Sequence, residues 1–146
     1  MITHVKCDIF EVETDILCHQ VNAQGVMGAG LAYQMRIKHP EVYGAYRHWC
    51  KNVGADDAFG SWLVVPTRSG KLVVNICAQK YYGYRDCYTD YATLYNAFKF
   101  INKKYPGKTV AVPHGIGCGL AGGNWDRVYA IIEETLVDVD CLICHL

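Results

Sequence analysis

The order of hydrophobic and polar positions along the chain predicts strands that alternate with helices. Short apolar runs indicate strands at residues 2–7, 15–22, 61–66, 71–77, 109–112 and 140–146. Apolar residues at helical spacing predict helices at residues 31–38, 40–50, 91–105 and 125–134. Interleaving of this kind predicts an α/β fold in which a mixed, mainly parallel sheet is covered by helices on both faces.

Local signals place the connections between these elements. The segment at residues 68–70 is short and ends in glycine, so the strands on either side of it should form an antiparallel hairpin. Thr89 is in position to cap the helix at residues 91–105. The polar and glycine-containing stretch at residues 52–57 is predicted to be a loop.

Composition and charge narrow the class of protein. The chain has 146 residues, of which 51% are hydrophobic and 19% charged, which is typical of one globular domain spanning residues 1–146. The formal net charge is zero, so the sequence gives no strong nucleic-acid footprint and no sign of capture by a membrane surface. No run approaches the length of a membrane span and the N-terminus has no signal-peptide pattern, so we expect a cytoplasmic protein.

The eight cysteines are expected to be structural rather than metal-binding or disulfide-bonded. Cys141 and Cys144 form a CxxC pair within the last predicted strand. Residues three apart on a strand point to opposite faces of the sheet, so these two thiols should not share a metal. The sequence therefore predicts no metal site and no resident cofactor.

A glycine-rich stretch at residues 113–124 joins a predicted strand to a predicted helix and contains five glycines. Glycine lets the backbone adopt positive φ and lets a ligand approach bare amides, and a helix N-terminus adds positive potential. Together these features predict an anion site of the kind that holds phosphates. A second glycine-rich loop at residues 23–30 follows another buried strand, so a ligand could be held from two sides.

Residues 117–122 also match the GxGxxG pattern of dinucleotide-binding folds. That pattern should open a longer unit, with an acidic residue closing a second strand about 20 residues later. Here Asp138 and Asp140 precede the last strand instead, which leaves no room for such a unit. The glycines therefore suit a pyrophosphate but not a standard NAD enzyme.

Three polar residues near the predicted strand ends are candidates for the site. Asn22 could exchange hydrogen bonds with a sugar hydroxyl pair, or could simply shape the turn that follows it. His19 is either a satisfied buried histidine or a catalytic one, and it should face away from Asn22 unless the strand breaks between them. Asp8 closes the first strand on the same rim, where it is otherwise an ordinary loop carboxylate.

Three motifs in this order and spacing resemble the macrodomain family over essentially the whole chain. They are Asp8-Ile9-Phe10; His19-Gln20-Val21-Asn22 leading to Met27-Gly28-Ala29-Gly30-Leu31-Ala32; and Pro113-His114-Gly115-Ile116-Gly117-Cys118-Gly119-Leu120. The resemblance implies a three-layer α/β/α domain that binds ADP-ribose. It implies that Asp8 and Ile9 contact the adenine, Asn22 and residues 28–30 the distal ribose, and residues 115–119 the diphosphate.

Members of this family divide into readers, ADP-ribosyl hydrolases and ADP-ribose 1″-phosphate phosphatases. The hydrolase branch that uses a lysine and an aspartate would place them at Gln79 and Ala121, so this chain departs from that pattern at both positions. Lys80 could substitute only if the loop slipped by one residue. The phosphatase-like branch has a histidine that matches His19, and the chain resembles it more closely.

The resemblance leads to three hypotheses. The first is metal-independent hydrolysis of a substituent on the terminal ribose, most simply the 1″-phosphate, with His19 as general acid or base and Asn22 gripping the ribose. The second is a non-catalytic reader or sponge for ADP-ribose, and the third is an ADP-ribosyl hydrolase acting on protein or nucleic acid. Residues Tyr81, Tyr82 and Tyr84 either close over the ligand or pack beneath their own loop.

Overall fold

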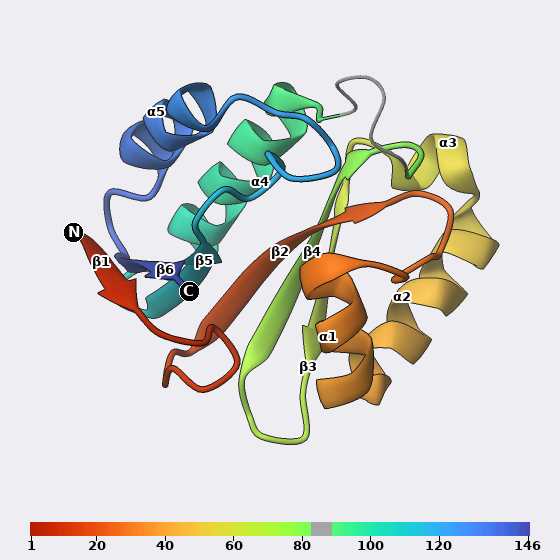
Figure 1. Ribbon diagram of the computed structural model, residues 1–146, viewed down its shortest axis with the longest axis horizontal. Helices are drawn as coiled ribbons and strands as arrows, with labels where there is room; N and C mark the ends of the chain where they lie inside the picture. The colour runs from red at the N-terminus through yellow and green to blue at the C-terminus, as the bar shows by residue number, and fades with distance from the viewer. Residues whose placement is uncertain (83–88) are drawn as a thin grey trace.

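The computed structural model describes residues 1–82 and 89–146 as three layers, with helices on both faces of a central sheet (Figure 1). The strands are β1 Ile2–Lys6, β2 Ile16–Asn22, β3 Trp62–Pro66, β4 Leu72–Gln79, β5 Thr109–Pro113 and β6 Asp140–His145. The helices are α1 Gly30–Lys38, α2 Pro40–Val53, α3 Ala55–Ala58, α4 Tyr91–Lys104 and α5 Trp125–Thr135.

The strands pair in the order β1-β6-β5-β2-β4-β3. Every pair is parallel except β3 with β4, which form the predicted antiparallel hairpin. The α/β class and the mixed, mainly parallel sheet are therefore confirmed. Because five strands run in the same direction, their carboxyl ends meet at one edge of the sheet, where ligands of open α/β folds bind.

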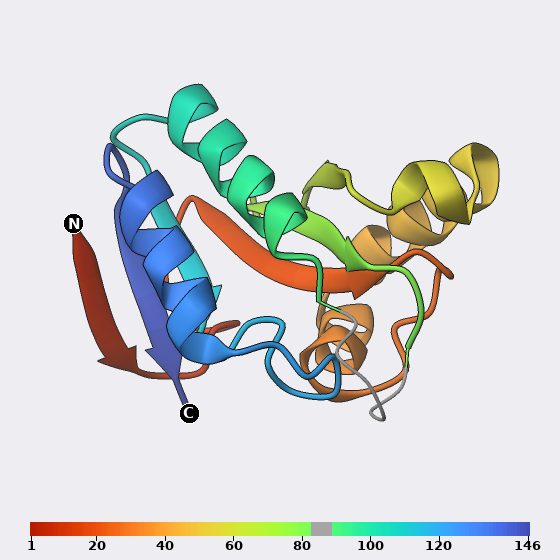
Figure 2. The same ribbon diagram turned by 90° about the horizontal axis from the view of Figure 1, so that it is seen from above.

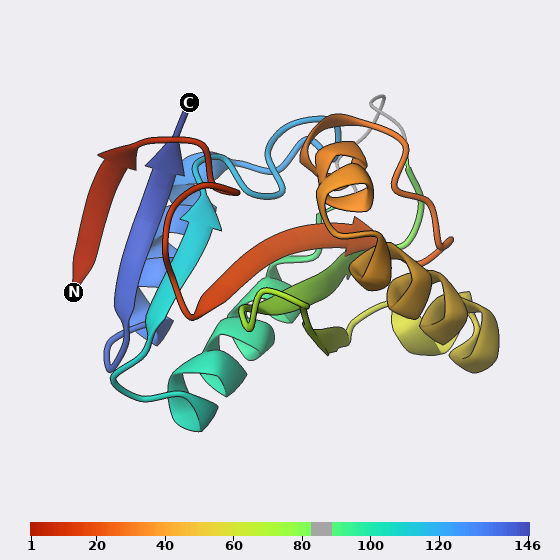
Figure 3. The same cartoon turned by 90° about the horizontal axis from the view of Figure 1, so that it is seen from below.

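Two hydrophobic clusters hold the layers together, one on each face of the sheet. Helices α4 and α5 pack on one face, and α1, α2 and α3 lie on the other, as the views from above and below show (Figures 2 and 3). Strand β2 is buried from both sides: Ile16 and Cys18 belong to the α4 and α5 cluster, Leu17 and Val21 to the other. Residues that alternate along a strand face opposite sides, which explains this division.

The same alternation confirms the prediction for the CxxC pair. Cys141 packs in the cluster beneath α4 and α5, whereas Cys144 packs in the cluster beneath α1 and α2. Within residues 1–82 and 89–146, no group of three or more His, Cys, Asp or Glu side chains could hold a metal ion. Among these same residues, no helix has the length and apolar character of a membrane span.

Two local predictions are wrong. Residues 52–57 are not a loop, because α2 continues to Val53 and α3 starts at Ala55. Gly54 separates the two helices with φ of 85°, and acidic residues in the first turn of α3 suit the positive end of its dipole. The cap of α4 is Asp90, whose carboxylate accepts from the Thr93 amide, and not Thr89.

The remaining element boundaries lie within three residues of the predicted positions. Strand β4 continues through Ala78 to Gln79, which brings the start of the tyrosine-rich segment to the carboxyl edge of the sheet. Tyr81 and Tyr82 are exposed there, with 53% and 62% of their surface accessible, so packing beneath the loop is not their role. Tyr84 and Cys87 lie outside the described residues.

Candidate functional site

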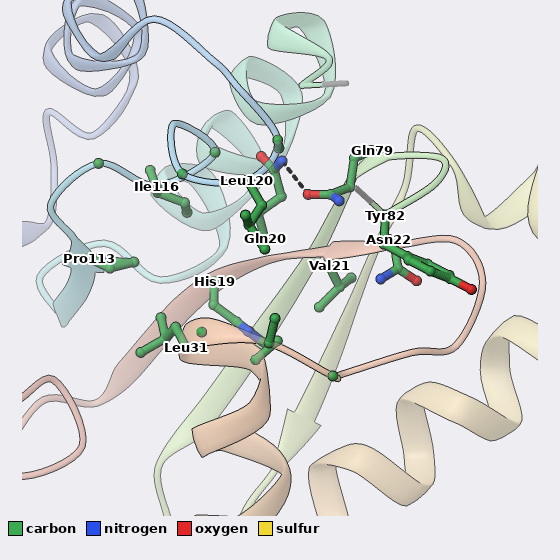
Figure 4. Close-up of a pocket in the computed structure, with 18 of the residues that line it drawn as sticks. His19, Gln20, Val21, Asn22, Leu31, Gln79, Tyr82, Pro113, Ile116 and Leu120 are labelled. Carbon is green, nitrogen blue, oxygen red and sulfur yellow. Dashed lines mark hydrogen bonds between the residues drawn. The ribbon is translucent and has the colours of Figure 1, made fainter. Parts of the chain in front are cut away.

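A pocket of about 590 Å³ opens at the carboxyl edge of the sheet (Figure 4). Residues 23–32, which include the start of α1, form one side of the pocket and are called the first wall. Residues 113–121, which begin at the end of β5, form the opposite side and are called the second wall. The ends of β2 and β4 lie between the two walls. The two glycine-rich stretches that the sequence singled out are therefore brought face to face.

Most of the predicted site residues line this pocket. These are His19, Asn22, Gly28, Ala29, Gly30, Leu31, Pro113, Gly115, Ile116, Gly117, Gly119 and Leu120. Asp8, Ile9 and Cys118 do not line it. Among the described residues that do, none is Lys, Arg, Asp or Glu, so an anion in this pocket would be held by backbone dipoles.

The amides of the second wall alternate between two roles. Those of Ile116 and Cys118 donate to carbonyls of Pro113 and Gly115. The amides of Gly115, Gly117 and Gly119 make no hydrogen bond within the described part of the chain. Gly115 and Gly117 have φ of 79° and 75°, and alternation of positive and negative φ turns successive amides toward one concave side. The wall thus offers unpaired donors to a ligand.

A polar network braces the second wall from beneath. The Thr89 hydroxyl donates to the Gly117 carbonyl at 2.6 Å, and the Gly123 amide donates to the same carbonyl at 2.8 Å. Gln20 Nε2 donates to Thr89 Oγ1 at 3.1 Å. It also donates to Gln79 Oε1 at 2.9 Å, the bond drawn in Figure 4. A Cβ at Gly117 would lie 2.7 Å from Gln20 Oε1, so a side chain there would collide with the network.

The first wall presents a helix N-terminus. The N-cap of α1 is Ala29, which makes no side-chain capping bond, and the first turn carries no acidic residue. The amides of Gly30, Leu31 and Ala32 have no acceptor among the described residues, while Tyr33 is the first whose amide bonds back, to Ala29. Free amides and the helix dipole make this end of α1 attractive to an anion.

The sequence predicted the wrong helix for this role. Helix α5 follows the longer glycine stretch, but its own Asn124 caps it by accepting from the Arg127 amide, and Trp125 does not line the pocket. The chain must turn through residues 119–123 before α5 begins, which moves that helix end away from the ligand space. The positive helix end at the pocket belongs to α1.

Asn22 shapes the first wall through its side chain. Its Oδ1 accepts from the Gln24 amide at 2.9 Å and from the Tyr46 hydroxyl at 2.9 Å, and its Nδ2 donates to the Val26 carbonyl at 2.8 Å. The turn interpretation of Asn22 is therefore correct. One Nδ2 hydrogen is left for a ligand, since an amide nitrogen has two.

The strand irregularity that would bring His19 and Asn22 to one site is present. The register of β2 against β4 shifts between Gln20 and Asn22, so strict alternation fails there and both side chains line the pocket. The His19 side chain extends from β2 toward the first turn of α1 (Figure 4). It is 1% exposed, and burial lowers its pKa to about 4, although its hydrogen bond to Asn75 opposes that shift.

Asp8 and Ile9 lie on the same rim but outside the pocket. The Asp8 carboxylate accepts from the Phe10 amide at 2.9 Å and thereby tightens the turn after β1. Ile9 is 4% exposed and packs in the core beneath α1 and α2. They follow β1, which is separated only by β6 from β5, the strand that leads into the second wall. Cys118 Sγ points back to the Ile116 carbonyl.

Lys80 points away from the pocket. Its Nζ pairs with Asp56 at 2.6 Å, while its carbonyl accepts from the Ala23 amide and from the Gln24 side chain. Gln79, one residue earlier at the end of β4, lines the pocket instead. The loop has therefore not slipped by the one residue that would bring Lys80 into the site. Ala121 also lines the pocket and is 6% exposed.

Sequence reasoning gave no supporting role to several residues that build the site. Gln20, Gln79, Thr89, Tyr46 and Asn75 hold the walls and the strand ends in place. Gln20 carried one usable signal, because it lies where the apolar run of its strand gives way to polar residues, between His19 and Asn22. Tyr46 and Asn75 carried none, since a tyrosine in an amphipathic helix and an asparagine in a strand acquire their partners only from tertiary contacts.

Known proteins resemble this chain along its length. A "DNA ADP-ribosyl glycohydrolase" of Mycobacterium tuberculosis is 30% identical over 98% of this chain, which spans only 42% of that relative. The "ADP-ribose glycohydrolase OARD1" of Bos taurus is 29% identical over 97% of this chain and 88% of its own. An "ADP-ribose 1″-phosphate phosphatase" of Scheffersomyces stipitis is 23% identical over 98% and 99%.

Among solved structures, the macrodomain of Mycobacterium tuberculosis DarG has a TM-score of 0.80 and 30% identity, covering 100% of this chain and 98% of its own. No family model matches the sequence. Similarity of this extent, in sequence and in fold, shows that the chain belongs to the macrodomain family.

Proposed function

We propose that this domain binds ADP-ribose, or an ADP-ribose derivative, in the pocket between the two walls. The observation that carries the proposal is the set of unpaired amides at Gly115, Gly117 and Gly119 opposite the uncapped start of α1. Two diphosphate charges fit a site of this kind because amides and a helix dipole stabilise anions without a charged side chain. The pocket volume of about 590 Å³ is within the range of sites for small ligands.

The positions of the two walls determine where each end of the bound ligand would lie. The terminal ribose would lie against Asn22 and residues 28–30, where one amide hydrogen of Asn22 remains available. The adenosine end would leave past Pro113 toward Asp8 and Ile9, on the rim beside β1. In this arrangement the Asp8 carboxylate accepts from the adenine amino group.

We also propose that the domain hydrolyses a substituent on the terminal ribose, with ADP-ribose 1″-phosphate as the leading substrate. Water would attack phosphorus, the bond between phosphorus and the 1″ oxygen would break, and that oxygen would take up a proton. His19 and His114 are the histidines that line the described pocket, so base chemistry there falls to a ring nitrogen. This assignment is supported by the two relatives named as an ADP-ribose glycohydrolase and as an ADP-ribose 1″-phosphate phosphatase.

Two measurements test the proposal. ADP-ribose should raise the melting temperature, because a ligand bound only by the folded state stabilises it. Incubation with ADP-ribose 1″-phosphate should release inorganic phosphate and ADP-ribose in equal amounts. Absence of a melting shift at millimolar ADP-ribose would refute binding, and a shift without phosphate release would refute the phosphatase activity alone.

A second candidate activity is removal of ADP-ribose from DNA or protein. It is favoured by the relatives of 29% and 30% identity, which are both named as glycohydrolases. The exposed side chains of Val26, Tyr82 and Leu120 at the pocket mouth leave space for a larger substituent. Release of ADP-ribose from ADP-ribosylated DNA or protein, with no phosphate released from the 1″-phosphate, would select this activity.

A reader without turnover is the third candidate. Gln79 and Ala121 stand where the lysine and aspartate of one hydrolase branch are expected, and both line the pocket. If the missing pair is what prevents ADP-ribosyl release, the double variant Gln79→Lys with Ala121→Asp should gain it while the parent protein only binds. Turnover by the parent protein on any of the three substrates would exclude the reader function.

We further propose a reducing compartment such as the cytoplasm. Cys7, Cys18, Cys50, Cys77, Cys141 and Cys144 carry free thiols, and free thiols persist where the environment is reducing. Fractionation of the native source with an antibody against the protein tests this placement.

A further inference from the structure

A row of three polar groups crosses the sheet beneath the first wall. His19 on β2 is the direct cross-strand neighbour of Asn75 on β4, and Asn75 is the neighbour of Leu63 on β3. His19 Nε2 lies 2.6 Å from Asn75 Oδ1, and Asn75 Nδ2 donates to the Leu63 carbonyl at 3.0 Å. Both side chains are buried, with 1% and 0% of their surface accessible.

The row fixes which nitrogen of His19 carries the proton. The carbonyl of Leu63 can only accept, so the amide nitrogen of Asn75 must face β3 and its oxygen must face β2. That oxygen also can only accept, and therefore His19 Nε2 must donate to it. A neutral imidazole has one N–H, so Nδ1 is left as a bare acceptor.

Nδ1 of His19 has no hydrogen-bond partner among the described residues, although the atom is buried and the side chain lines the pocket. A buried acceptor without a partner costs free energy, so such atoms call for an explanation. A histidine kept only to satisfy the core would have both ring nitrogens paired. The neighbouring amides of α1 lie at the same wall, where the ligand is proposed to end.

We infer that Asn75 is a positioning residue that holds His19 as the Nε2–H tautomer, so that Nδ1 accepts a hydrogen bond from a hydroxyl of the bound terminal ribose. This inference rests on the proposed binding of ADP-ribose. His19 is then an acceptor in the site and not a proton donor, because its only N–H is committed to Asn75. Asn75 was given no role by the sequence, and it reaches the ligand only through His19.

Nuclear magnetic resonance of the unaltered protein tests both halves of the inference. In protein labelled with ¹⁵N-histidine, long-range proton–nitrogen spectra identify the protonated nitrogen of each ring. His19 should show Nε2 protonated and Nδ1 bare without ligand, and ADP-ribose should shift the Nδ1 resonance. A protonated Nδ1, or a Nδ1 that ADP-ribose leaves unmoved, would overturn the inference.

ADP serves as the matched ligand, since it has the adenosine and both phosphates but no terminal ribose. It should leave the Nδ1 resonance in place while shifting amides of residues 115–119. An equal Nδ1 shift with ADP would overturn the assignment to the terminal ribose. Failure of the proposed ADP-ribose binding would give a different result from failure of the inference about His19. In that case neither ADP-ribose nor ADP would shift any amide of the two walls.

Two variants of one position separate positioning from structural support. Asn75→Asp and Asn75→Leu both lose the bond to Leu63, but only the aspartate retains an acceptor for Nε2. The aspartate variant should keep the Nε2–H tautomer and the Nδ1 shift with ADP-ribose. The leucine variant should lose the fixed tautomer and bind ADP-ribose about 10-fold more weakly, the lower end of the loss seen when partners that orient metal-binding histidines are removed.

Circular dichroism confirms that each variant is folded before its spectrum is used. Equal behaviour of the two variants in tautomer and in affinity would show that Asn75 only supports the sheet, and would overturn its positioning role. If either variant fails to fold, the spectra of the unaltered protein with ADP-ribose and ADP decide the inference.

Discussion

The two walls of the pocket expose amide donors by different means. The first wall uses the end of a regular helix, whose opening amides are unpaired by the geometry of any α-helix. The second wall uses an irregular loop in which unpaired amides alternate with paired ones. The first wall depends on a helix dipole, and the second depends on the positive φ of Gly115 and Gly117. Two unrelated local structures therefore present the same chemistry to one ligand.

Support beneath the walls differs as well. The side chain of Asn22 behind the first wall has its oxygen fully used by Gln24 and Tyr46. Behind the second wall, Gln20 Oε1 is buried without a partner among the described residues, although both hydrogens of its amide are used. Behind the first wall, His19 Nδ1 is likewise buried without a partner among these residues. A Cβ at Gly117 would collide with Gln20 Oε1, so we expect the second wall to respond more strongly to substitution.

The largest effect should come from Gly117→Ala. The new Cβ would meet Gln20 Oε1 at 2.7 Å and the backbone would keep a φ of 75°, which strains any residue with a side chain. The strain and the displaced amides should weaken ADP-ribose binding by about 10- to 100-fold, since hydrogen bonds to charged groups contribute about 1.5–3 kcal/mol each. Titration calorimetry measures the affinity.

Gly119→Ala is the control for that substitution. A Cβ there meets no atom within 4 Å, and Gly119 is absent from the glycines with positive φ. The Gly119→Ala protein should unfold at nearly the same temperature as the parent protein. A Gly117→Ala protein with unchanged affinity would contradict the role assigned to the second wall.

The pH dependence of stability should reveal the histidine behind the first wall. Burial lowers the pKa of His19 to about 4 from an ordinary value of 6.5, so the folded state disfavours its protonation. The resulting stability is fully present above about pH 6.5 and is lost as pH falls through 4, a change on the order of 3 kcal/mol. Urea unfolding across this range measures it.

His19→Gln removes the titrating group and keeps a polar side chain beside Asn75. The difference in unfolding free energy between this variant and the parent should therefore change with pH between 6.5 and 4 and be flat above that window. A difference that is constant over the whole range would show that His19 is not held neutral by burial.

Removing one hydroxyl behind each wall compares their support directly. Tyr46→Phe deletes the bonds to the Asn22 carbonyl and Oδ1, and Thr89→Val deletes the bond to the Gly117 carbonyl. Each should lower the free energy of unfolding by about 1–3 kcal/mol, because Tyr46→Phe removes the donor to Asn22 and Thr89→Val leaves a Gln20 Nε2 hydrogen without its acceptor. ADP-ribose affinity should fall further in Thr89→Val, since Gly117 itself offers an amide to the ligand. The reverse order would show that the first wall is the more sensitive one.

The smallest effect should come from Gly44→Ala, which lies on the exposed face of α2 and touches neither wall. A Cβ there meets no atom within 4 Å, and alanine in a helix interior is favoured over glycine by about 0.5–1 kcal/mol. The melting temperature should rise while the further increase caused by ADP-ribose stays the same. A change in that increment would mean that stability and binding cannot be separated by these measurements.

The sequence by itself determined the layers of the fold and the two glycine-rich stretches. Apolar runs and helical stripes depend on local periodicity, and positive φ at Gly115 and Gly117 depends on the absence of a side chain. These properties belong to single residues or short segments, so they can be recognised without partners. The zero net charge likewise gave no sign of capture by surface charge, and no charged side chain is among the described residues that line the pocket.

Tertiary structure decided which helix faces the ligand and what each polar side chain does. Helix α1 replaced α5 at the pocket because the chain must turn through residues 119–123 before α5 begins. The tautomer of His19 depends on Asn75, which is 56 positions away, and the turn at Asn22 depends on Tyr46 in α2. Hydrogen bonds between distant residues are fixed by strand register and helix packing, which no local pattern encodes.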